Sequence, residues 1–359
     1  MTMTTDTKPT AEIDETKLNE LVGRFLGDLG AALHATTVVV GDKLGLYKAL
    51  AEGPATPAEL AARTGTNERL IQEWLNTQLA SGYCERDGER YLLTPEQTAV
   101  LAAEGGPAFL VGAMTLAGSV AKDEAKICEA FRSSRGLGWH EHHHDLFHGT
   151  ERFFKPGYLA NLVSSWIPAL EGVEAKLQQG AKVADLGCGH GASTILLAQA
   201  YPNATIVGFD YHPDSIDEAR KRAADAGVAD RVSFEVASAQ EFPGQGYDLV
   251  CVFDALHDMG DPSGAATHIA SALADDGTLL FVEPMAGETS AENMNPLGRI
   301  YYAASTTICT PAAQNQPGGY ALGAQVPEST WRSIMADSGF SRFRRATETP
   351  VNRVFEVRR

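Results

Sequence analysis

The stretch that decides the fold is residues 183–191, Val-Ala-Asp-Leu-Gly-Cys-Gly-His-Gly. The apolar residues at its start predict a buried strand, and the apolar run after it predicts a helix. Glycines between the two permit a tight turn and let the backbone approach a ligand without Cβ clashes. The first turn of the helix offers free N–H groups and a positive dipole end, which suit a carboxylate. The stretch therefore predicts a strand–turn–helix unit that binds a ligand at its turn.

Apolar runs and helical segments alternate downstream of this unit. After the strand at 181–187, further strands are predicted at 205–210, 232–237, 247–253 and 278–284, and the end of the chain predicts a helix followed by a hairpin. This alternation is typical of a parallel sheet with helices on both faces. Asp210 ends the second strand, 25 residues after Asp185. At about this spacing an acidic residue binds ribose hydroxyls in dinucleotide folds.

The N-terminal part has the pattern of a winged helix. Apolar spacing predicts helices over 17–52. Thr56 with Glu59 forms a capping-box signature for a short helix, and Asn67 begins a longer helix that stops at 81–82. Two short strands then flank Asp87-Gly88, a hairpin signal. Helix, turn, helix and hairpin together predict a winged helix.

Composition restricts the classes of function. The chain has 359 residues, 44% of them hydrophobic, and a formal net charge of −17, which disfavours non-specific binding to nucleic acid. No apolar run reaches 18 residues, so no membrane span is expected. The polar, acidic N-terminus lacks the features of a signal peptide, and the five cysteines form no CxxC pair. We therefore expect a cytoplasmic protein with reduced thiols.

Several segments together resemble one family. DLGCGHG and VGFDYH resemble motif I and the following acidic strand end of class I methyltransferases that use S-adenosylmethionine (SAM). From about residue 20, the chain resembles the mycobacterial-type methyltransferases with an N-terminal winged helix, to which ERFFKPGYLANLVSSW and FDALHDMGDP also correspond. The resemblance implies an α/β, Rossmann-like sheet of seven strands whose last pair is antiparallel. It also implies SAM as cofactor and S-adenosylhomocysteine as product.

This interpretation divides the chain into four parts. We expect a disordered tail at 1–16, a winged-helix dimerisation domain at 17–100, a helical linker and pocket segment at 101–180, and a SAM-binding catalytic domain at 181–359 with a lid insertion at 286–326. An insertion on the ligand side of a sheet commonly forms a lid, but a surface elaboration or a dimer contact is the alternative.

The resemblance also implies a set of cofactor-binding residues. Asp185, Gly187, Cys188 and Gly189 would surround the methionine part, Asp210 would bind the ribose, Tyr211 would flank the adenine, Ser238 and Ala239 would lie at the adenine edge, Phe253 and Asp254 would form the far wall, and Tyr158 would touch the ligand from the helix before the first strand. One position departs from the family pattern: Ser238 stands where many relatives carry an acidic residue for the adenine amino group.

A catalytic base is implied by a second, partial resemblance. Residues 256–261, Leu-His-Asp-Met-Gly-Asp, resemble the LHDWSD stretch of plant-type small-molecule O-methyltransferases, whose histidine is the general base. His257 would then be the base on an acceptor hydroxyl. Met259 and Gly260 depart from the pattern. The alternative is that His257 and Asp258 only cap the loop and shape the cofactor wall.

The acceptor site is expected among the aromatic and histidine residues. We assign substrate contacts to His144, Phe154 and Tyr302. His140, His144 and His148 are spaced four apart, so one helix would align them on a single face. No CxxC or HExxH accompanies them, and no metal is predicted. Lining of the substrate pocket, a polar surface and a metal site all remain open for this cluster.

The winged helix has two possible roles. Its second helix contains one cation, Arg69, against Glu68 and Glu73, whereas Trp74 and Leu79 offer apolar surface. We therefore expect a homodimer that completes the pocket, with DNA binding unlikely, and a small, lipophilic or aromatic acceptor methylated at oxygen. Methylation at nitrogen, carbon or sulfur remains open. The alternative function is a winged-helix regulator or ligand sensor that retains a SAM-binding domain.

Overall fold

The computed structural model describes residues 13–359 and divides into two compact units at Thr98–Ala99. The expected tail at 1–16 falls largely outside the described residues. Its last residues differ from the prediction, because the first helix begins at Glu15. Asp14 caps that helix by accepting hydrogen bonds from the backbone N–H groups of Thr16 and Lys17.

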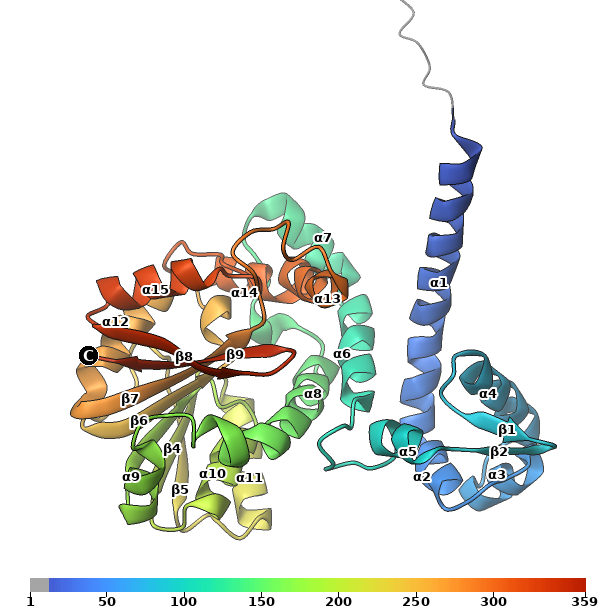
Figure 1. The fold of residues 1–359 in the computed structure, drawn as a ribbon, viewed down its shortest axis with the longest axis horizontal. Helices are drawn as coiled ribbons and strands as arrows, with labels where there is room; N and C mark the ends of the chain where they lie inside the picture. The colour runs from blue at the N-terminus through green and yellow to red at the C-terminus, as the bar shows by residue number, and fades with distance from the viewer. Residues whose placement is uncertain (1–12) are drawn as a thin grey trace, which may run out of the picture. The chain divides into compact units, whose positions relative to one another are not determined.

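The first unit is a small helical domain with one hairpin (Figure 1). Its elements are α1 (Glu15–Lys43), α2 (Leu46–Ala51), α3 (Pro57–Thr64), α4 (Glu68–Ala80), β1 (Glu85–Asp87) and β2 (Arg90–Leu92), and α5 (Pro95–Leu101) crosses into the second unit. The capping box of Thr56 and Glu59 is present, and the Asn67 side chain caps α4. These contacts confirm the sequence-based winged-helix prediction.

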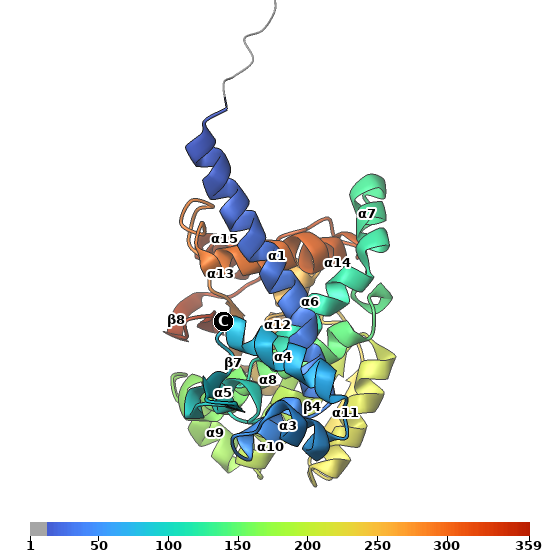
Figure 2. The same ribbon diagram turned by 90° about the vertical axis from the view of Figure 1, so that its right-hand side faces the viewer.

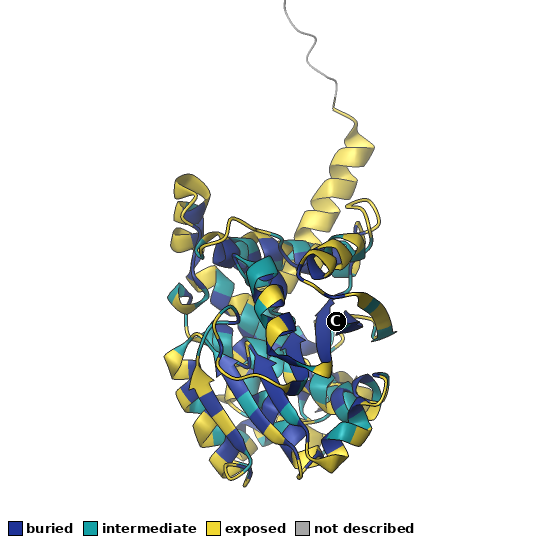
Figure 3. Cartoon of the chain, turned by 90° about the vertical axis from the view of Figure 1, so that its left-hand side faces the viewer, coloured by how far each residue is buried: buried dark blue, intermediate teal, exposed yellow. Residues whose placement is uncertain are grey.

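The long helix α1 is only partly packed. Its C-terminal end contributes Val38 to the core of the first unit, and Gly41 lies so close to Trp74 that a Cβ atom would be 2.6 Å from the indole ring. Figure 2 shows α1 as one long, unbroken helix. Residues 15–27 in its N-terminal turns are all exposed, and these turns are yellow in Figure 3. The exposed apolar side chains there are Leu18, Leu21, Val22, Phe25, Leu26, Leu29 and Leu33.

The second unit is built on a seven-stranded sheet. The strands are β3 (Lys182–Leu186), β4 (Thr205–Asp210), β5 (Val232–Val236), β6 (Tyr247–Phe253), β7 (Leu273–Pro284), β8 (Arg342–Glu348) and β9 (Asn352–Arg358). They lie in the order β5-β4-β3-β6-β7-β9-β8. β3 to β7 are parallel, and β9 pairs antiparallel with both β7 and β8. The order reverses at β3, where ligands bind in open α/β sheets.

Helices cover both faces of this sheet, because most central strand residues are apolar on both sides. Residues of α9 (Val173–Gln179), α10 (Ala192–Ala200) and α11 (Pro213–Asp225) pack in one core cluster, and those of α12 (Pro262–Ala272) and α15 (Glu328–Asp337) pack in the other. The central strands are dark blue, hence buried, in Figure 3. The sheet therefore presents its carboxyl edge, rather than a face, to ligands.

Helical segments precede the sheet in the chain. They are α6 (Val111–Lys122), α7 (Glu124–Ser133), the 3-10 turn η1 (Trp139–Glu141), α8 (Asp145–Asn161) and the π-helical turn η2 (Leu162–Trp166). α6 and α8 touch through glycines: a Cβ atom on Gly112 would lie 2.6 Å from the backbone of Arg152, and one on Gly149 would lie 2.5 Å from the Leu116 nitrogen. Only glycine allows this approach.

The prediction that one helix aligns His140, His144 and His148 is wrong. η1 ends at Glu141 and α8 begins only at Asp145. Asp123 explains the break, because its carboxylate accepts the His143 backbone N–H at 2.7 Å and contacts His142 Nδ1 at 3.1 Å. These bonds turn the chain between the two helical segments.

The predicted insertion, residues 286–326, contains α13 (Pro296–Ala304), the π-helical turn η4 (Ser305–Cys309) and α14 (Thr310–Gln314). Gln316 follows α14 and ties the insertion to the loop after β6. Its amide nitrogen donates to the Asp258 carbonyl at 2.9 Å, and its amide oxygen accepts the Gly260 N–H at 3.3 Å. The insertion thus reaches the carboxyl edge of the sheet.

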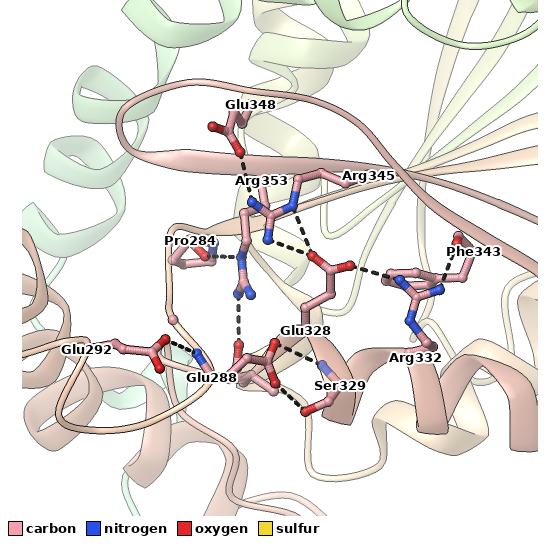
Figure 4. Close-up of polar contacts among 12 residues, drawn as sticks. Pro284, Glu288, Glu292, Glu328, Ser329, Arg332, Phe343, Arg345, Glu348 and Arg353 are labelled. Atoms are coloured by element: carbon pink, nitrogen blue, oxygen red, sulfur yellow. Dashed lines mark hydrogen bonds and ion pairs between the residues drawn. The ribbon is translucent and has the colours of Figure 1, made fainter.

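The end of β7 is braced by a buried arginine (Figure 4). Arg353, on β9 opposite Glu283, donates to the carbonyls of Pro284 at 3.0 Å and Val326 at 2.8 Å. Burial lowers the pKa of this guanidinium, although nearby Glu283 opposes the shift. The bracing fixes the strand end that carries Glu283.

Among the described residues, no helix is both long and apolar enough to cross a membrane.

Candidate functional site

A cavity lies at the carboxyl ends of β3, β4 and β6. Its lining residues come from the turn after β3, the ends of β4 and β6, helix α8 and the insertion. They are Trp139, Phe147, Thr150, Glu151, Phe154, Tyr158, Gly187, Cys188, Gly189, His190, Ala192, Ser193, Asp210, Tyr211, Ser215, Phe253, Asp254, Ala255, Asp258, Met259, Ala312 and Gln316. This is the position at which open α/β sheets bind ligands.

Glycines shape the turn between β3 and α10. Gly187, Gly189 and Gly191 all have positive φ, which a side chain would strain. A Cβ atom on Gly191 would also lie 2.8 Å from the Phe234 ring. The turn therefore presents bare backbone and the first N–H groups of α10 to the cavity.

Asp185 supports this turn from behind. It is buried and does not line the cavity. The hydroxyls of Ser193 and Thr194, in the first turn of α10, both donate to its Oδ2 at 2.6 Å. Burial raises the pKa of Asp185 to about 6, although the two hydroxyls oppose the rise. Its carboxylate thus anchors the start of α10 rather than facing a ligand.

Asp210 ends β4 and lines the cavity. Its Oδ2 accepts the Gly189 N–H and its Oδ1 accepts the His212 N–H, each at 2.9 Å. Burial raises its pKa, and the two backbone N–H groups oppose that rise. The carboxylate links the two strand ends and still offers acceptor lone pairs to a ligand hydroxyl.

Aromatic rings enclose one end of the cavity. Phe147 stacks on His212 at 4.9 Å and meets Trp139 edge-on at 5.5 Å, measured between ring centroids. The Tyr211 hydroxyl lies 3.5 Å from His140 Nδ1. Trp139 and Phe147 come from the histidine-rich segment, which therefore reaches the cavity through its aromatic residues.

A second aromatic group lines the wall formed by α8 and β6. The Tyr158 ring lies 6.4 Å from Phe154 and 5.4 Å from Phe253. Burial raises the pKa of the Tyr158 hydroxyl well above its usual value, and Asp254 adds to the shift. The ring is therefore neutral and apolar toward the cavity.

An ion network holds α8 against the turn after β3. Glu151 of α8 contacts His190 Nδ1 at 3.0 Å and is ion-paired with Arg222 of α11. Burial raises the pKa of Glu151, but His190 and Arg222 outweigh it, so that the pKa is lowered. The Glu151 carboxylate is therefore ionised beside Arg222, which also pairs with Glu218.

His257 lies behind the cavity in the 3-10 turn η3 (Leu256–Asp258), with 3% of its surface exposed. Its Nδ1 is 2.8 Å from Glu283 Oε2 and its Nε2 is 3.0 Å from Asp258 Oδ1. Burial lowers its pKa, but Glu283 and Asp258 outweigh burial and raise it well above 6.5. Two carboxylates therefore flank the ring and favour its protonated form, and Asp258 is the member of this group that lines the cavity.

Asp254 has a strained backbone at the end of β6. Its φ is +48°, in the left-handed region that residues other than glycine rarely adopt. Its Oδ1 accepts a hydrogen bond from the Asn352 amide at 2.7 Å, and its buried Oδ2 has no protein partner in the described chain. Burial raises the pKa of Asp254 well above its usual value, and Glu283 adds to the shift. Such strain is concentrated at functional sites.

The cavity brings together part of the predicted set. Phe154, Tyr158, Gly187, Cys188, Gly189, Asp210, Tyr211, Phe253 and Asp254 line it. Asp185, Ser238, Ala239 and His257 do not. Tyr302 lines a second cavity beside α7 and α14, and the His144 side chain is 82% exposed beside Asp145. His144 therefore has no place in the first cavity, because the turn at Asp123 directs it to the surface.

Within residues 13–359, two groups of side chains have donor atoms close enough to share a metal ion. They are His143, His144 and Asp145 at the surface, and His257, Asp258 and Cys309 beneath the cavity. In the second group the 3.0 Å separation of His257 Nε2 and Asp258 Oδ1 is that of a direct ion pair.

Sequence reasoning missed several lining residues. Three of them lie more than thirty residues before β3: Trp139 in η1, and Phe147 and Glu151 in α8. They reach the cavity only because these two helical segments pack against it. No motif around these aromatic and acidic residues indicates that they line a ligand cavity. Glu283 was also missed, although it stands at the end of a predicted strand, where ligand-site residues are expected.

Comparison with known families assigns both units. Residues 177–325 match a family described as a methyltransferase domain, and residues 31–103 match the Rv2258c-like winged HTH domain. The chain carries a winged-helix domain followed in sequence by a methyltransferase domain. This confirms the fold class predicted from the sequence.

Solved structures share the fold of both parts. A putative O-methyltransferase from Nostoc punctiforme superposes with a TM-score of 0.69 and 21% identity, covering 94% of this chain and 98% of that one. Human N-acetylserotonin methyltransferase, solved in complex with SAM, gives 0.68 and 17%, covering 98% and 99%. At these identities the likeness establishes the fold.

Curated relatives match shorter stretches of the chain. The 27-O-demethylrifamycin SV methyltransferase of Amycolatopsis mediterranei is 33% identical over 131 residues, which are 34% of this chain and 48% of that protein. The trans-aconitate 2-methyltransferase of Streptomyces avermitilis is 34% identical over 105 residues, 29% and 39% respectively. The chain thus spans less than half the length of the curated relatives it matches.

Proposed function

We propose that the protein transfers a methyl group from SAM to a small molecule. The observation that carries the proposal is the cavity at the β3 turn, where glycine backbone, the N-terminus of α10 and Asp210 converge within a methyltransferase domain. The SAM carboxylate would bind the N–H groups at the start of α10, and its ribose hydroxyls would donate to Asp210. Tyr211 would flank the adenine, with Ser238 and Ala239 beyond it.

The reaction requires mainly alignment. A sulfonium is an activated donor, and holding it in line with the acceptor can supply roughly 7–11 kcal/mol. Tyr158, Phe253 and Asp254 line the wall beside the turn and would hold the methyl donor against the acceptor. S-adenosylhomocysteine would leave as the product.

Oxygen is the proposed target, because a proton acceptor stands at the cavity. A hydroxyl loses its proton when it is methylated, and general-base help contributes typically 10²–10⁴-fold. The raised pKa of His257 favours its protonated form, so we assign the proton to the Asp258 carboxylate, which lines the cavity beside it. His257 and Glu283 would position that carboxylate. In this proposal Asp258, rather than His257, is the base.

The proton acceptor is tested with the His257→Ala and Asp258→Asn variants. Each should lower turnover by about 100-fold while SAM affinity stays nearly unchanged. A loss below about tenfold in Asp258→Asn would remove its role as base and shift the target toward nitrogen or sulfur. A loss of SAM affinity would instead assign the residues to the cofactor wall.

We also propose that the first unit forms a homodimer. Large apolar side chains are exposed along the first turns of α1. A contiguous exposed apolar surface of this kind commonly marks a protein–protein interface. A twofold axis would let two copies of α1 bury each other's apolar side chains. Phe25→Glu together with Leu29→Glu should give monomers by light scattering, whereas dimers that persist in this variant would contradict the proposal.

A regulator that only senses a ligand is the second candidate. It would need a basic surface on α4, yet Arg69, the one cation of that helix, is ion-paired with Glu73 at an exposed site. Incubation with methyl-labelled SAM and a panel of phenols, amines and thiols decides between the two functions. Labelled product supports the enzyme. DNA retardation at low salt without any product would support the regulator.

A further inference from the structure

The charged side chains around the cavity are mostly of one sign. Four carboxylates line it, those of Glu151, Asp210, Asp254 and Asp258, together with the imidazole of His190. Over residues 13–359, no lysine or arginine appears among the lining side chains. A cavity built for a carboxylate-bearing acceptor would be expected to offer guanidinium or ammonium groups.

Two of the four carboxylates are already satisfied. Glu151 lies between His190 and Arg222, so it already has two partners, although Arg222 also pairs with Glu218. Asp210 accepts two backbone N–H groups and stands where the ribose is proposed to bind. Neither provides a net negative charge for an acceptor.

The other two carboxylates are not balanced. Among the described residues, Asp254 has a buried oxygen without a hydrogen-bond partner. Burial and Glu283 raise its pKa and only His257 among nearby cations lowers it, so Asp254 needs a bound cation to stay ionised. The His257 imidazole is shared between Asp258 and Glu283. Three carboxylates therefore lie around one imidazole. Bound SAM carries a sulfonium, an α-ammonium and a carboxylate, so it would add a net charge of only +1.

Aromatic rings complete the environment. Phe154, Tyr158 and Phe253 line the same wall as Asp254, and Trp139 and Phe147 lie at the other end. The faces of aromatic rings attract cations as well as flat apolar molecules. A positively charged aromatic molecule would fit both features of this wall.

We propose that the methyl acceptor is an aromatic molecule bearing a positively charged amine, with Asp254 as the counter-ion of that amine. The proposal rests on the proposed methyl transfer, because it assigns the substrate class of the same cavity. It implies that affinity falls from cationic to neutral to anionic acceptors. Acceptors that resemble a polycarboxylate would be excluded.

The test uses three phenols that differ in one substituent. Tyramine carries an ammonium, 4-ethylphenol is neutral, and 3-(4-hydroxyphenyl)propionate carries a carboxylate. Their affinities are measured by calorimetry on the full chain saturated with SAM. Tyramine should bind at least tenfold more tightly than 4-ethylphenol, and the propionate at least tenfold more weakly, because an unscreened charge pair near 4 Å interacts strongly in a cavity.

Variants assign the effect to Asp254. Asp254→Asn should reduce the tyramine preference to less than threefold, whereas Asp337→Asn, an exposed control on α15, should leave it unchanged. If Asp254→Asn does not fold, the order of the three phenols in the native protein decides. Tyramine that binds no better than 4-ethylphenol, or not at all at millimolar concentration, overturns the proposal. Because SAM is titrated first, absent SAM binding identifies a failure of the proposed function instead.

Discussion

Glu283→Gln tests the buried charge group beneath the cavity. The substitution keeps the size of the side chain and an oxygen that can accept from His257, but it removes the negative charge. Glu283 is fully buried and its Oε2 lies 2.8 Å from the ring nitrogen. Hydrogen bonds to charged groups contribute about 1.5–3 kcal/mol and neutral ones about 0.5–1.5. The variant should therefore lose about 1–2 kcal/mol of unfolding free energy.

The pH dependence of this loss has a defined sign. Because the pKa of His257 is raised in the folded protein, the folded state binds this proton more tightly than the unfolded state. The stabilisation is complete below the unfolded pKa, about 6.5, and is lost as pH rises through the raised folded pKa. The difference between native protein and variant should thus be largest near pH 6 and should shrink in alkaline solution.

Chemical denaturation of the methyltransferase unit at pH 6 and pH 9 measures this difference. Glu129→Gln, an exposed change on α7, serves as the matched control and should alter stability by less than about 0.5 kcal/mol. A double-mutant cycle with His257→Gln isolates the pair, and its coupling energy should exceed about 1 kcal/mol at pH 6. Coupling below about 0.5 kcal/mol, or equal at both pH values, would refute the ion-pair account.

Three further predictions concern the turn and the cofactor. Asp210→Ala should weaken SAM binding about tenfold or more in calorimetry, since hydrogen bonds to its carboxylate are charge-assisted. Gly191→Ala should cost about 1–3 kcal/mol in denaturation, because φ is +80° and the new methyl would meet the Phe234 ring. Gly157→Ala, in an open helical position, should be neutral or stabilising, so a loss there as large as that of Gly191→Ala would discount the steric argument.

The sequence predicted the sheet well, because each strand is a local apolar run and each helix between them has its own spacing. The caps at Thr56 and Asn67 were equally local, since a capping side chain binds backbone only two or three residues away. The antiparallel last pair came from family resemblance, and the pairing of β8 with β9 confirms it.

From the sequence, the site could be predicted only at residues whose type indicates the local backbone conformation. Gly187 and Gly189 occupy positions of positive φ, and Asp210 ends a strand beside them. Trp139 and Phe147 reach the cavity only because of how the segment before the sheet folds. Asp123 interrupts the helix in that segment by hydrogen bonds to His142 and His143. Periodicity alone could not show that contact, and it therefore gave a false helix across the histidines.

The charge state of His257 was likewise outside the reach of sequence reasoning. Its neighbour Asp258 is visible in the motif, but Glu283 comes from another strand and contributes the second carboxylate. Two carboxylates beside one imidazole raise its pKa and so favour its protonated form. That conclusion requires the distance between His257, which follows β6 in η3, and Glu283 at the end of β7.

Titration of SAM into the full-length protein by calorimetry tests the central claim most directly. The account predicts saturable binding of one SAM per chain, displacement by S-adenosylhomocysteine, and an affinity that falls at least tenfold in Asp210→Ala. Absence of measurable heat and of displacement, in a protein shown to be folded by its unfolding transition, would contradict the claim that this cavity is a SAM site.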